Sequence, residues 1–193
     1  MGTKLSRKHP GQNKTRSNLL KWSILFILIL GALGIWLVLR TPSQTSTTAQ
    51  SGVQMGDVAP DFTVPTLDGA KFTLSEQRGK PTIIYFTAYW CGSCIPKAQE
   101  LGQLYQEYNG RVNIIALDVD PTSTPELLDQ FKQAAGNGAF VWAFDSDSKV
   151  ATAYRVNALS TIIILDGEGR IVYRGHFPTS YAALKGEAEK LQP

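Results

Sequence analysis

The chain has 193 residues, of which 43% are hydrophobic and 18% are charged, and its formal net charge is +3. That length accommodates one domain with an appended segment. Two cysteines are too few for the disulfide framework of a small secreted scaffold, and two histidines leave a closed structural zinc site short of its usual ligands. A basic excess can indicate a polyanion partner if it is spread over the folded domain, so we first locate the charges along the chain.

Positive charge is concentrated in residues 1–40, which hold seven of the 19 lysines and arginines and none of the 16 acidic residues. The rest of the chain has twelve basic and sixteen acidic residues, a formal charge of −4. We therefore interpret residues 1–18 as a basic cytoplasmic tail that sets membrane topology. We expect no nucleic acid among the partners.

An apolar stretch follows this tail. Trp22–Leu39 contains eighteen residues without a charge, and Leu19–Leu20 extend it across Lys21. A helix of this length spans about 31 Å, close to a hydrocarbon thickness of about 30 Å. The stretch is longer than the apolar core of a cleaved signal peptide, and no small-residue cleavage site follows it. We predict one transmembrane anchor helix over residues 19–40, with everything after Arg40 on the extracytoplasmic side of the cell membrane.

Residues 41–52 form a linker in this interpretation, because they are uncharged and rich in serine and threonine. About twelve flexible residues give an end-to-end distance of roughly 20 Å. Residues 53–193 then form one domain that is expected to work close to the membrane surface.

Strand and helix patterns alternate along residues 53–193. The Asp68-Gly69 dipeptide predicts a hairpin turn, and a β-branched and aromatic run predicts a buried central strand over residues 81–88. The later elements are expected in this order: helix 92–108, strand 112–119, helix 124–136 with Thr124 as its N-cap, strand 140–144, helix 147–156 with Asp147 as its cap, paired strands 160–166 and 170–175, and helix 180–191. This order predicts an α/β domain with a central mixed sheet covered by helices, and an active surface at the carboxyl ends of its parallel strands.

Both cysteines fall in Trp90-Cys91-Gly92-Ser93-Cys94, between the predicted central strand and the next helix. In this context the chain resembles the thioredoxin superfamily, and within it the membrane-anchored thiol–disulfide oxidoreductases of the TlpA/ResA type. The resemblance covers nearly all of residues 53–193 and rests also on Ala59-Pro60-Asp61-Phe62, Leu67-Asp68-Gly69, Gly79-Lys80-Pro81 and Asp166-Gly167-x-Gly169. It implies a thioredoxin-like fold with an N-terminal hairpin extension, and an enzyme that needs no cofactor.

Disulfide exchange requires a thiolate, and a helix N-terminus, equivalent to about half a positive charge, favours that anion. We therefore expect Cys91 to be the nucleophile and Cys94, one turn further and less exposed, to be the resolving thiol of a redox-active disulfide. Trp90 is interpreted either as an apolar rim that shields the pair or as a packing residue, and Gly92 and Ser93 complete the motif. A structural disulfide is the alternative, but so small a loop gains only about 2 kcal/mol.

Three positions depart from the family pattern. Leu159-Ser160 stands where thioredoxin-like proteins have a cis-proline facing the cysteines, and a trans bond is expected because a non-proline cis bond costs about 3–4 kcal/mol. Lys97 replaces an acid of the ResA type. A cation beside the thiols would lower a thiolate pKa, but an exposed helix lysine is the preferred interpretation. Pro96 falls in the first helical turn, where proline is tolerated.

Two other functions are considered. Without the proline, two thiolates suit a Sco-like carrier of a soft ion such as Cu(I), and His176 is the one histidine outside the predicted cytoplasmic tail; we interpret it as a surface residue and expect no metal site. The opening motifs also occur in peroxiredoxins, whose P-x-x-x-T-x-x-C would require proline at Ile84 and threonine at Ala88. Asp118 and Asp120 end a strand near the active edge of the sheet, where they could help proton transfer, but a solvated strand end is the preferred interpretation.

The resemblance also implies partners and a direction. Relatives of this type more often reduce than oxidise, taking electrons from a membrane thiol-electron transporter and passing them to exported proteins such as apocytochrome c. Roles in cytochrome c biogenesis and cell redox homeostasis follow. Potentials in this fold run from about −270 to about −120 mV, so the sequence alone leaves the direction open.

Overall fold

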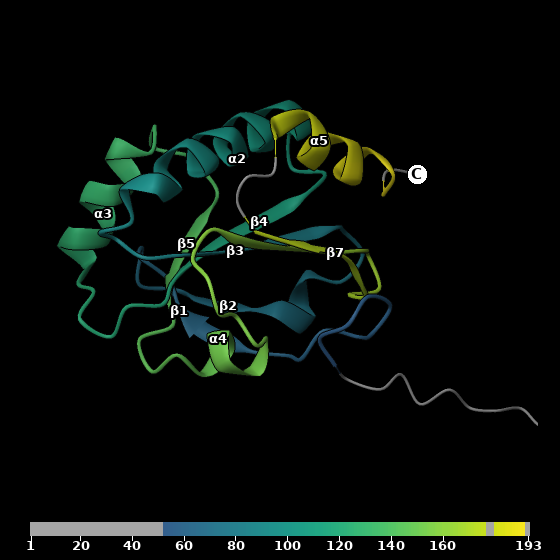
Figure 1. The fold of residues 1–193 in the computed structure, drawn as a ribbon, viewed down its shortest axis with the longest axis horizontal. Coiled ribbons are helices and arrows are strands. Elements are labelled where there is room, and N and C mark those ends of the chain that lie inside the picture. The colour runs from purple at the N-terminus through teal and green to yellow at the C-terminus, as the bar shows by residue number, and fades with distance from the viewer. Residues whose placement is uncertain (1–51, 177–179, 192–193) are drawn as a thin grey trace, which may run out of the picture. The chain divides into compact units, whose positions relative to one another are not determined.

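The computed structural model describes residues 52–176 and 180–191, and its centre is a five-stranded mixed sheet (Figure 1). The strand order is β5-β4-β3-β6-β7. The first three strands in this order are mutually parallel, and β6 and β7 alternate in direction beside β3. Their bounds are β3 Thr82–Thr87, β4 Asn113–Asp118, β5 Val141–Phe144, β6 Thr161–Leu165 and β7 Ile171–Gly175.

The central strand β3 is buried at all six positions, as its β-branched and aromatic composition predicts. Because side chains alternate along a strand, Ile83 and Tyr85 belong to the core on one face of the sheet, and Ile84 and Phe86 to the core on the other. A strand covered on both faces is a rigid support for whatever follows its carboxyl end.

Helices cover one face of the sheet, and a hairpin with a short helix covers the other (Figure 1). The first layer consists of α2 (Ile95–Tyr108), α3 (Pro125–Ala134) and α5 (Tyr181–Glu189). The second consists of β1 (Thr63–Pro65), β2 (Lys71–Thr73) and α4 (Lys149–Ala153). Two short 3-10 turns, η1 (Leu74–Gln77) and η2 (Gly92–Cys94), complete the described elements.

The predicted order of strands and helices is confirmed, with shifts at two helix starts. The helix expected from residue 92 begins as the 3-10 turn η2, and the α-helix starts at Ile95 with Pro96 in its first turn. Thr124 caps α3 as predicted, accepting from the Leu127 N–H at 3.3 Å. For α4 the main cap is Asp145, which accepts from the backbone of the first helical turn, while Asp147 accepts from one N–H at 3.3 Å.

No helix among residues 52–176 and 180–191 is long and apolar enough to cross a membrane. The predicted basic tail (1–18), the predicted anchor (19–40) and all of the predicted linker except Gly52 lie outside the described residues. These three assignments therefore stay predictions.

Candidate redox site

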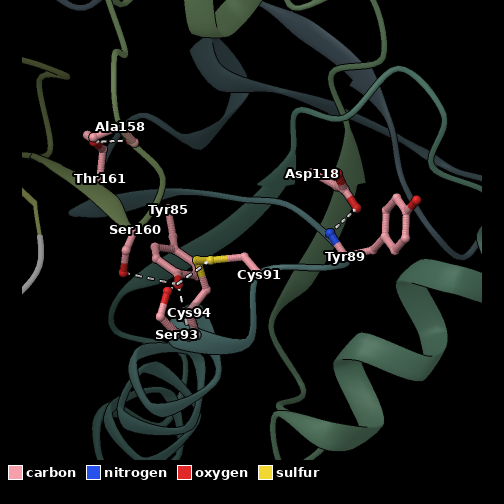
Figure 2. Close-up of a disulfide and its surroundings, with 9 residues drawn as sticks. All are labelled: Tyr85, Tyr89, Cys91, Ser93, Cys94, Asp118, Ala158, Ser160 and Thr161. Carbon is pink, nitrogen blue, oxygen red and sulfur yellow. Dashed lines mark hydrogen bonds between the residues drawn. A yellow bond between two sulfur atoms is a disulfide. The ribbon is translucent and has the colours of Figure 1, made fainter.

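Cys91 and Cys94 form a disulfide beyond the carboxyl end of β3, with their Cα atoms 5.3 Å apart (Figure 2). Cys91 is 5% exposed and Cys94 is completely buried. The order of exposure is the one expected from the sequence, and it leaves Cys91 as the sulfur that a second protein can reach.

Local hydrogen bonds explain why the chain turns at this point. The Cys91 N–H donates to the Ala88 carbonyl at 2.9 Å, and the Cys94 N–H donates to the Cys91 carbonyl at 2.9 Å. The sequence placed Cys91 at the start of an α-helix, whereas the structure puts η2 between Cys91 and that helix and makes Cys94 the N-cap of α2. The positive end of the α2 dipole therefore lies at Cys94.

Ser93 and Gly92 surround the outer sulfur. The Ser93 hydroxyl lies 3.5 Å from Cys91 Sγ, within hydrogen-bond reach of sulfur. When the disulfide is reduced, a hydroxyl in this position can donate to the Cys91 thiolate, and a hydrogen bond to the charged form favours that form. Gly92 is exposed, and a Cβ added there would meet no described atom within 4 Å, which leaves room for an approaching polypeptide.

A buried tyrosine lies behind the disulfide. The Tyr85 hydroxyl donates to the Cys94 carbonyl at 3.0 Å and lies 3.4 Å from Ser160 Oγ (Figure 2). Burial raises the pKa of Tyr85 to about 12, against the opposing effect of its hydrogen bond with Ser160. The hydroxyl thus stays protonated and remains a donor. Tyr85 is not among the residues predicted from the sequence. The feature that could have indicated it is a tyrosine in a strand buried on both faces, where the hydroxyl needs a hydrogen-bond partner.

Ser160 is buried and adopts a left-handed backbone conformation with φ of 62°. Its N–H donates to the Phe86 carbonyl at 2.9 Å. Proline has neither this N–H nor access to a positive φ, so the observed backbone explains why a residue other than proline stands here. Leu159 beside it is half-buried and packs against the helix-covered core.

The carboxylate at the end of β4 organises the loop before the cysteines. Asp118 is completely buried and accepts from the Tyr89 N–H at 3.0 Å, the Asp120 N–H at 3.0 Å and the Ser123 hydroxyl at 2.8 Å. Burial raises the pKa of Asp118 above its usual value. The interpretation of Asp118 as a solvated strand end is therefore wrong.

Trp90 lies on the surface next to Cys91. Its side chain is 59% exposed, and its Nε1–H donates to the Asp120 carboxylate at 2.6 Å. Hydrogen bonds from Thr122 and then from Trp90 lower the pKa of Asp120, so this acceptor is charged at neutral pH. This exposure contradicts the interpretation of Trp90 as a packing residue, whereas its role as an apolar rim beside the disulfide stays a prediction.

Lys97 is 2% exposed, so its interpretation as an exposed helix lysine is wrong. It forms an ion pair with Glu100 one turn further along α2. The buried residues of α2 include Lys97, Ala98 and Leu101, and the buried Cys94 is the N-cap of the same helix. A cation is thus enclosed one helical turn from the inner cysteine.

The positions tied to the alternative functions lie elsewhere. His176 is exposed at the end of β7. Among residues 52–176 and 180–191 there is no group of three or more histidine, cysteine or acidic side chains able to hold a metal ion. A peroxiredoxin motif would need proline at Ile84 and threonine at Ala88; Ile84 lies within β3, Ala88 directly follows that strand, and both are buried.

Comparisons with known proteins agree with this architecture. The profile of the AhpC/TSA family matches residues 55–174. The thiol-disulfide oxidoreductase ResA of Bacillus cereus (strain ZK / E33L) is 29% identical over 182 residues, which cover 92% of this chain and 99% of that protein. The thioredoxin-like protein YneN of Bacillus subtilis (strain 168) is 31% identical, covering 78% of this chain and 86% of that protein. Among solved structures, a putative protein disulfide isomerase from Bacteroides thetaiotaomicron has a TM-score of 0.65 at 26% identity, covering 74% of this chain and 94% of that one. The predicted thioredoxin-like fold is thereby confirmed.

Proposed function

This chain belongs to the AhpC/TSA family and is a thioredoxin-like thiol–disulfide oxidoreductase, and on that premise we propose that it is a membrane-anchored, extracytoplasmic reductant of disulfides in exported proteins. One observation carries the proposal. The disulfide lies at the carboxyl end of the central strand, with Cys91 5% exposed, Cys94 completely buried and the neighbouring Trp90 59% exposed.

The proposed reaction starts from the reduced pair. The Cys91 thiolate attacks one sulfur of a substrate disulfide, an S–S bond forms between the two proteins, and the released substrate thiolate takes up a proton. The Cys94 thiolate then attacks Cys91 Sγ, which forms the Cys91–Cys94 disulfide and releases the second substrate thiol. Two electrons have passed from the cysteine pair to the substrate, and a membrane dithiol transporter returns the pair to its reduced state.

Burial supports this division of roles. An external disulfide can approach Cys91 but not Cys94, so the first attack belongs to Cys91. Cys94 is one residue from the first turn of α2, and the positive end of the helix dipole favours its thiolate. Ser93, which lies against Cys91 Sγ, favours the thiolate at the outer position.

Two substitutions test the assignment in the full-length chain. With Cys94→Ser, we expect a covalent complex with substrate to accumulate, because the second attack is removed; it is seen as a band that disappears on reduction. With Cys91→Ser, we expect no such complex. Trapping through Cys94 instead would contradict the assigned order.

A redox titration of the Cys91/Cys94 couple tests the direction. A reductant of exported proteins needs a potential in the lower part of the range of this fold, close to about −270 mV, whereas an oxidant lies near about −120 mV. The two ends differ by roughly 7 kcal/mol for two electrons. A measured midpoint near the upper end would exclude the proposed direction while leaving disulfide exchange itself intact.

A further inference from the structure

A basic pocket lies at the end of the sheet opposite the disulfide. It has a volume of about 560 Å³ and is lined by Lys80, Arg111 and Lys190 together with glycine backbone, and none of the described residues that line it is acidic. We propose that this pocket binds the phosphate headgroups of anionic lipids, and so orients the domain on the membrane with its disulfide facing away. The proposal rests on the membrane anchoring proposed above.

The strand and helix directions separate the pocket from the redox site. Lys80 lies two residues before β3 begins, whereas Cys91 lies four residues after β3 ends. Six strand residues span about 17 Å. Helix α2 runs in the opposite direction, from its N-cap Cys94 near the redox site to the turn at Gly110, which lines the pocket. The helix is about 21 Å long. The two sites therefore occupy opposite ends of the domain.

The described chain starts at the same end as the pocket. The Gly52 N–H donates to the Val58 carbonyl at 3.0 Å, and Val58 pairs with Arg170 just after the β6–β7 turn. Gly167 of that turn accepts from the Gly79 N–H at 2.8 Å and lines the pocket. Figure 1 shows the first described residues and the end of α5 at the same end of the sheet, on opposite faces of it.

This entry point matters because of what precedes it in the sequence. The predicted linker ends at Gly52, and the predicted anchor lies only about twelve residues before it, a reach of roughly 20 Å. A short tether raises the effective concentration of the membrane surface at this end to the millimolar range, so even a weak headgroup site is filled.

Two of the three cations also have a simpler role, because they cap the carboxyl end of α2. This role leaves part of their hydrogen-bond donors available. Lys80 Nζ donates to the Gly110 carbonyl at 3.0 Å, and Arg111 Nε donates to the Tyr108 carbonyl at 3.1 Å. An ammonium has three N–H groups and a guanidinium has five, so each retains donors for a phosphate. Lys190 belongs to the turn after α5 and pairs with Glu187 at 2.7 Å, outside any cap of α2.

The uneven charge of the domain determines which of its ends faces an anionic membrane. Residues 41–193 carry a formal charge of −4, so most of the surface is repelled by an anionic bilayer while the basic pocket is attracted. At physiological salt, each lysine or arginine close to such a surface raises the ratio of docked to undocked domain about fivefold. Three of them together raise this ratio about 100-fold. Trp90 and Cys91 then point toward exported proteins and not toward lipid.

The test uses the full-length chain reconstituted in nanodiscs with a gadolinium chelate on a small fraction of the headgroups. In phosphatidylglycerol discs, we expect the amide resonances of Gly79, Gly110 and Gly167 to broaden while those of Trp90 and Cys91 stay sharp. In phosphatidylcholine discs, or in phosphatidylglycerol discs at 1 M NaCl, where the screening length falls to about 3 Å, the selective broadening should disappear.

The Lys80→Gln/Arg111→Gln/Lys190→Gln chain should lower the ratio of docked to undocked domain about 100-fold in phosphatidylglycerol. The matched control, Lys71→Gln/Lys149→Gln/Arg155→Gln, removes three exposed charges elsewhere and should leave the broadening unchanged. If the triple pocket variant does not fold, the salt titration of the unsubstituted chain gives the same answer.

Three results would overturn the proposal: equal broadening in both lipids, broadening centred on Trp90, or shifts of the pocket resonances by inorganic phosphate without any preference for phosphatidylglycerol. The last would make the pocket a site for free phosphate. Disulfide reduction measured on the same sample reports the proposed function separately, so a chain that reduces disulfides but does not dock contradicts this inference alone. A chain absent from the nanodisc fraction contradicts the anchoring on which it rests.

Discussion

The two sides of the disulfide are built differently (Figure 2). On one side, Tyr85 and Ser160 are buried and bond to backbone carbonyls; we call these two residues the buried flank. On the other side, Trp90 is exposed and bonded to Asp120, and Asp118 beneath them holds the loop; we call these three residues the loop flank. The buried flank contacts the inner cysteine, whereas the loop flank carries the surface next to the outer one. We infer that the first fixes the resolving thiol and the second receives the substrate.

The largest expected effect comes from Ser160→Pro in the buried flank. Proline removes the N–H that bonds to the Phe86 carbonyl, and its φ near −65° conflicts with the observed 62°. We expect a loss of about 3 kcal/mol or more in the free energy of unfolding, measured by urea denaturation of the detergent-solubilised chain. Ser160→Gly keeps the N–H and accepts a positive φ, so it should lose at most about 1 kcal/mol. If Ser160→Pro is as stable as the unsubstituted chain, this backbone can re-form around proline and our account of the position fails.

Tyr85→Phe, also in the buried flank, tests whether the Tyr85 hydroxyl affects only the stability of the fold or also the rate at which Cys94 resolves the mixed disulfide. Removing the hydroxyl takes away the side-chain donor to the Cys94 carbonyl and the partner of the Ser160 hydroxyl, which costs about 1–2 kcal/mol. Tyr154→Phe is the matched control, because Tyr154 also donates from a buried hydroxyl to a carbonyl, that of Pro60 at 2.6 Å, in the core on the other face.

Both tyrosine variants should lose similar stability, but only Tyr85→Phe should slow the resolution of the mixed disulfide. A change of about 1 kcal/mol in the barrier corresponds to about fivefold in rate, which rapid-quench measurements resolve. Equal resolution rates in the two variants would show that the buried flank supports the fold without positioning Cys94.

Between pH 3.5 and neutrality, the stability of the protein should depend on pH through the loop flank and not through the buried flank, where the pKa of Tyr85 is raised to about 12. Burial raises the pKa of Asp118 above its usual value of 3.8, so the folded chain holds this proton more tightly than the unfolded chain. As pH rises from 3.8 through the raised pKa, the folded state loses that advantage and its stability falls. In Asp118→Asn this loss is absent, so the stability of the variant relative to the unsubstituted chain should improve with rising pH and then level off.

The measurement for Asp118→Asn is a series of urea unfolding curves between pH 3.5 and neutrality. The slope against pH is the diagnostic quantity, because the amide also changes the three hydrogen bonds and shifts the whole curve. Asp120 has the opposite effect on the pH dependence of stability. Its pKa is lowered in the folded chain, so the stability that its ionisation contributes is lost as pH falls below its pKa in the unfolded chain. Parallel curves for the variant and the unsubstituted chain would mean that Asp118 ionises as freely in the folded protein as in the unfolded one.

Sequence patterns predicted the sheet, the helices and the place of the disulfide, because each depends on local periodicity and on one short motif. They did not predict the pairing of Tyr85 with Ser160, since these residues are 75 positions apart and only the β3–β6 pairing brings them together. Lys97 was misjudged for a different reason. It lies one turn from Cys94 on the apolar stripe of α2, a signal that was outweighed by the usual exposure of lysine.

Asp118 and the basic pocket lie at opposite ends of the sheet, and neither was predicted from the sequence. Asp118 is the last residue of a buried strand, and its burial depends on a loop, residues 119–123, that folds back to supply donors. Lys80, Arg111 and Lys190 come from three separate segments, and no spacing in the sequence links them. The third donor to Asp118, the Tyr89 N–H, lies 29 positions away in the sequence, and the pocket likewise depends on tertiary contact, so no sequence motif indicated either feature.

The smallest expected effect comes from Asp120→Ala, which releases the Trp90 ring without altering the cysteines. The substitution also removes the two hydrogen bonds that Asp120 accepts from Thr122. The bond to Trp90 is exposed and contributes about 0.5–1 kcal/mol, so we expect KM for a polypeptide disulfide to rise about two- to fivefold. Reaction with a small dithiol should be unchanged, because it needs no docking surface. Asp129→Ala is the control: Asp129 accepts from Gln133 Nε2 at 2.6 Å on α3, away from the disulfide. A shift of the Trp90 indole resonance, with that of Trp142 unmoved, verifies that the ring has been released. If the ring is released and KM is unchanged, the polypeptide binds elsewhere, and the loop flank serves to shield Cys91 and not to receive the substrate.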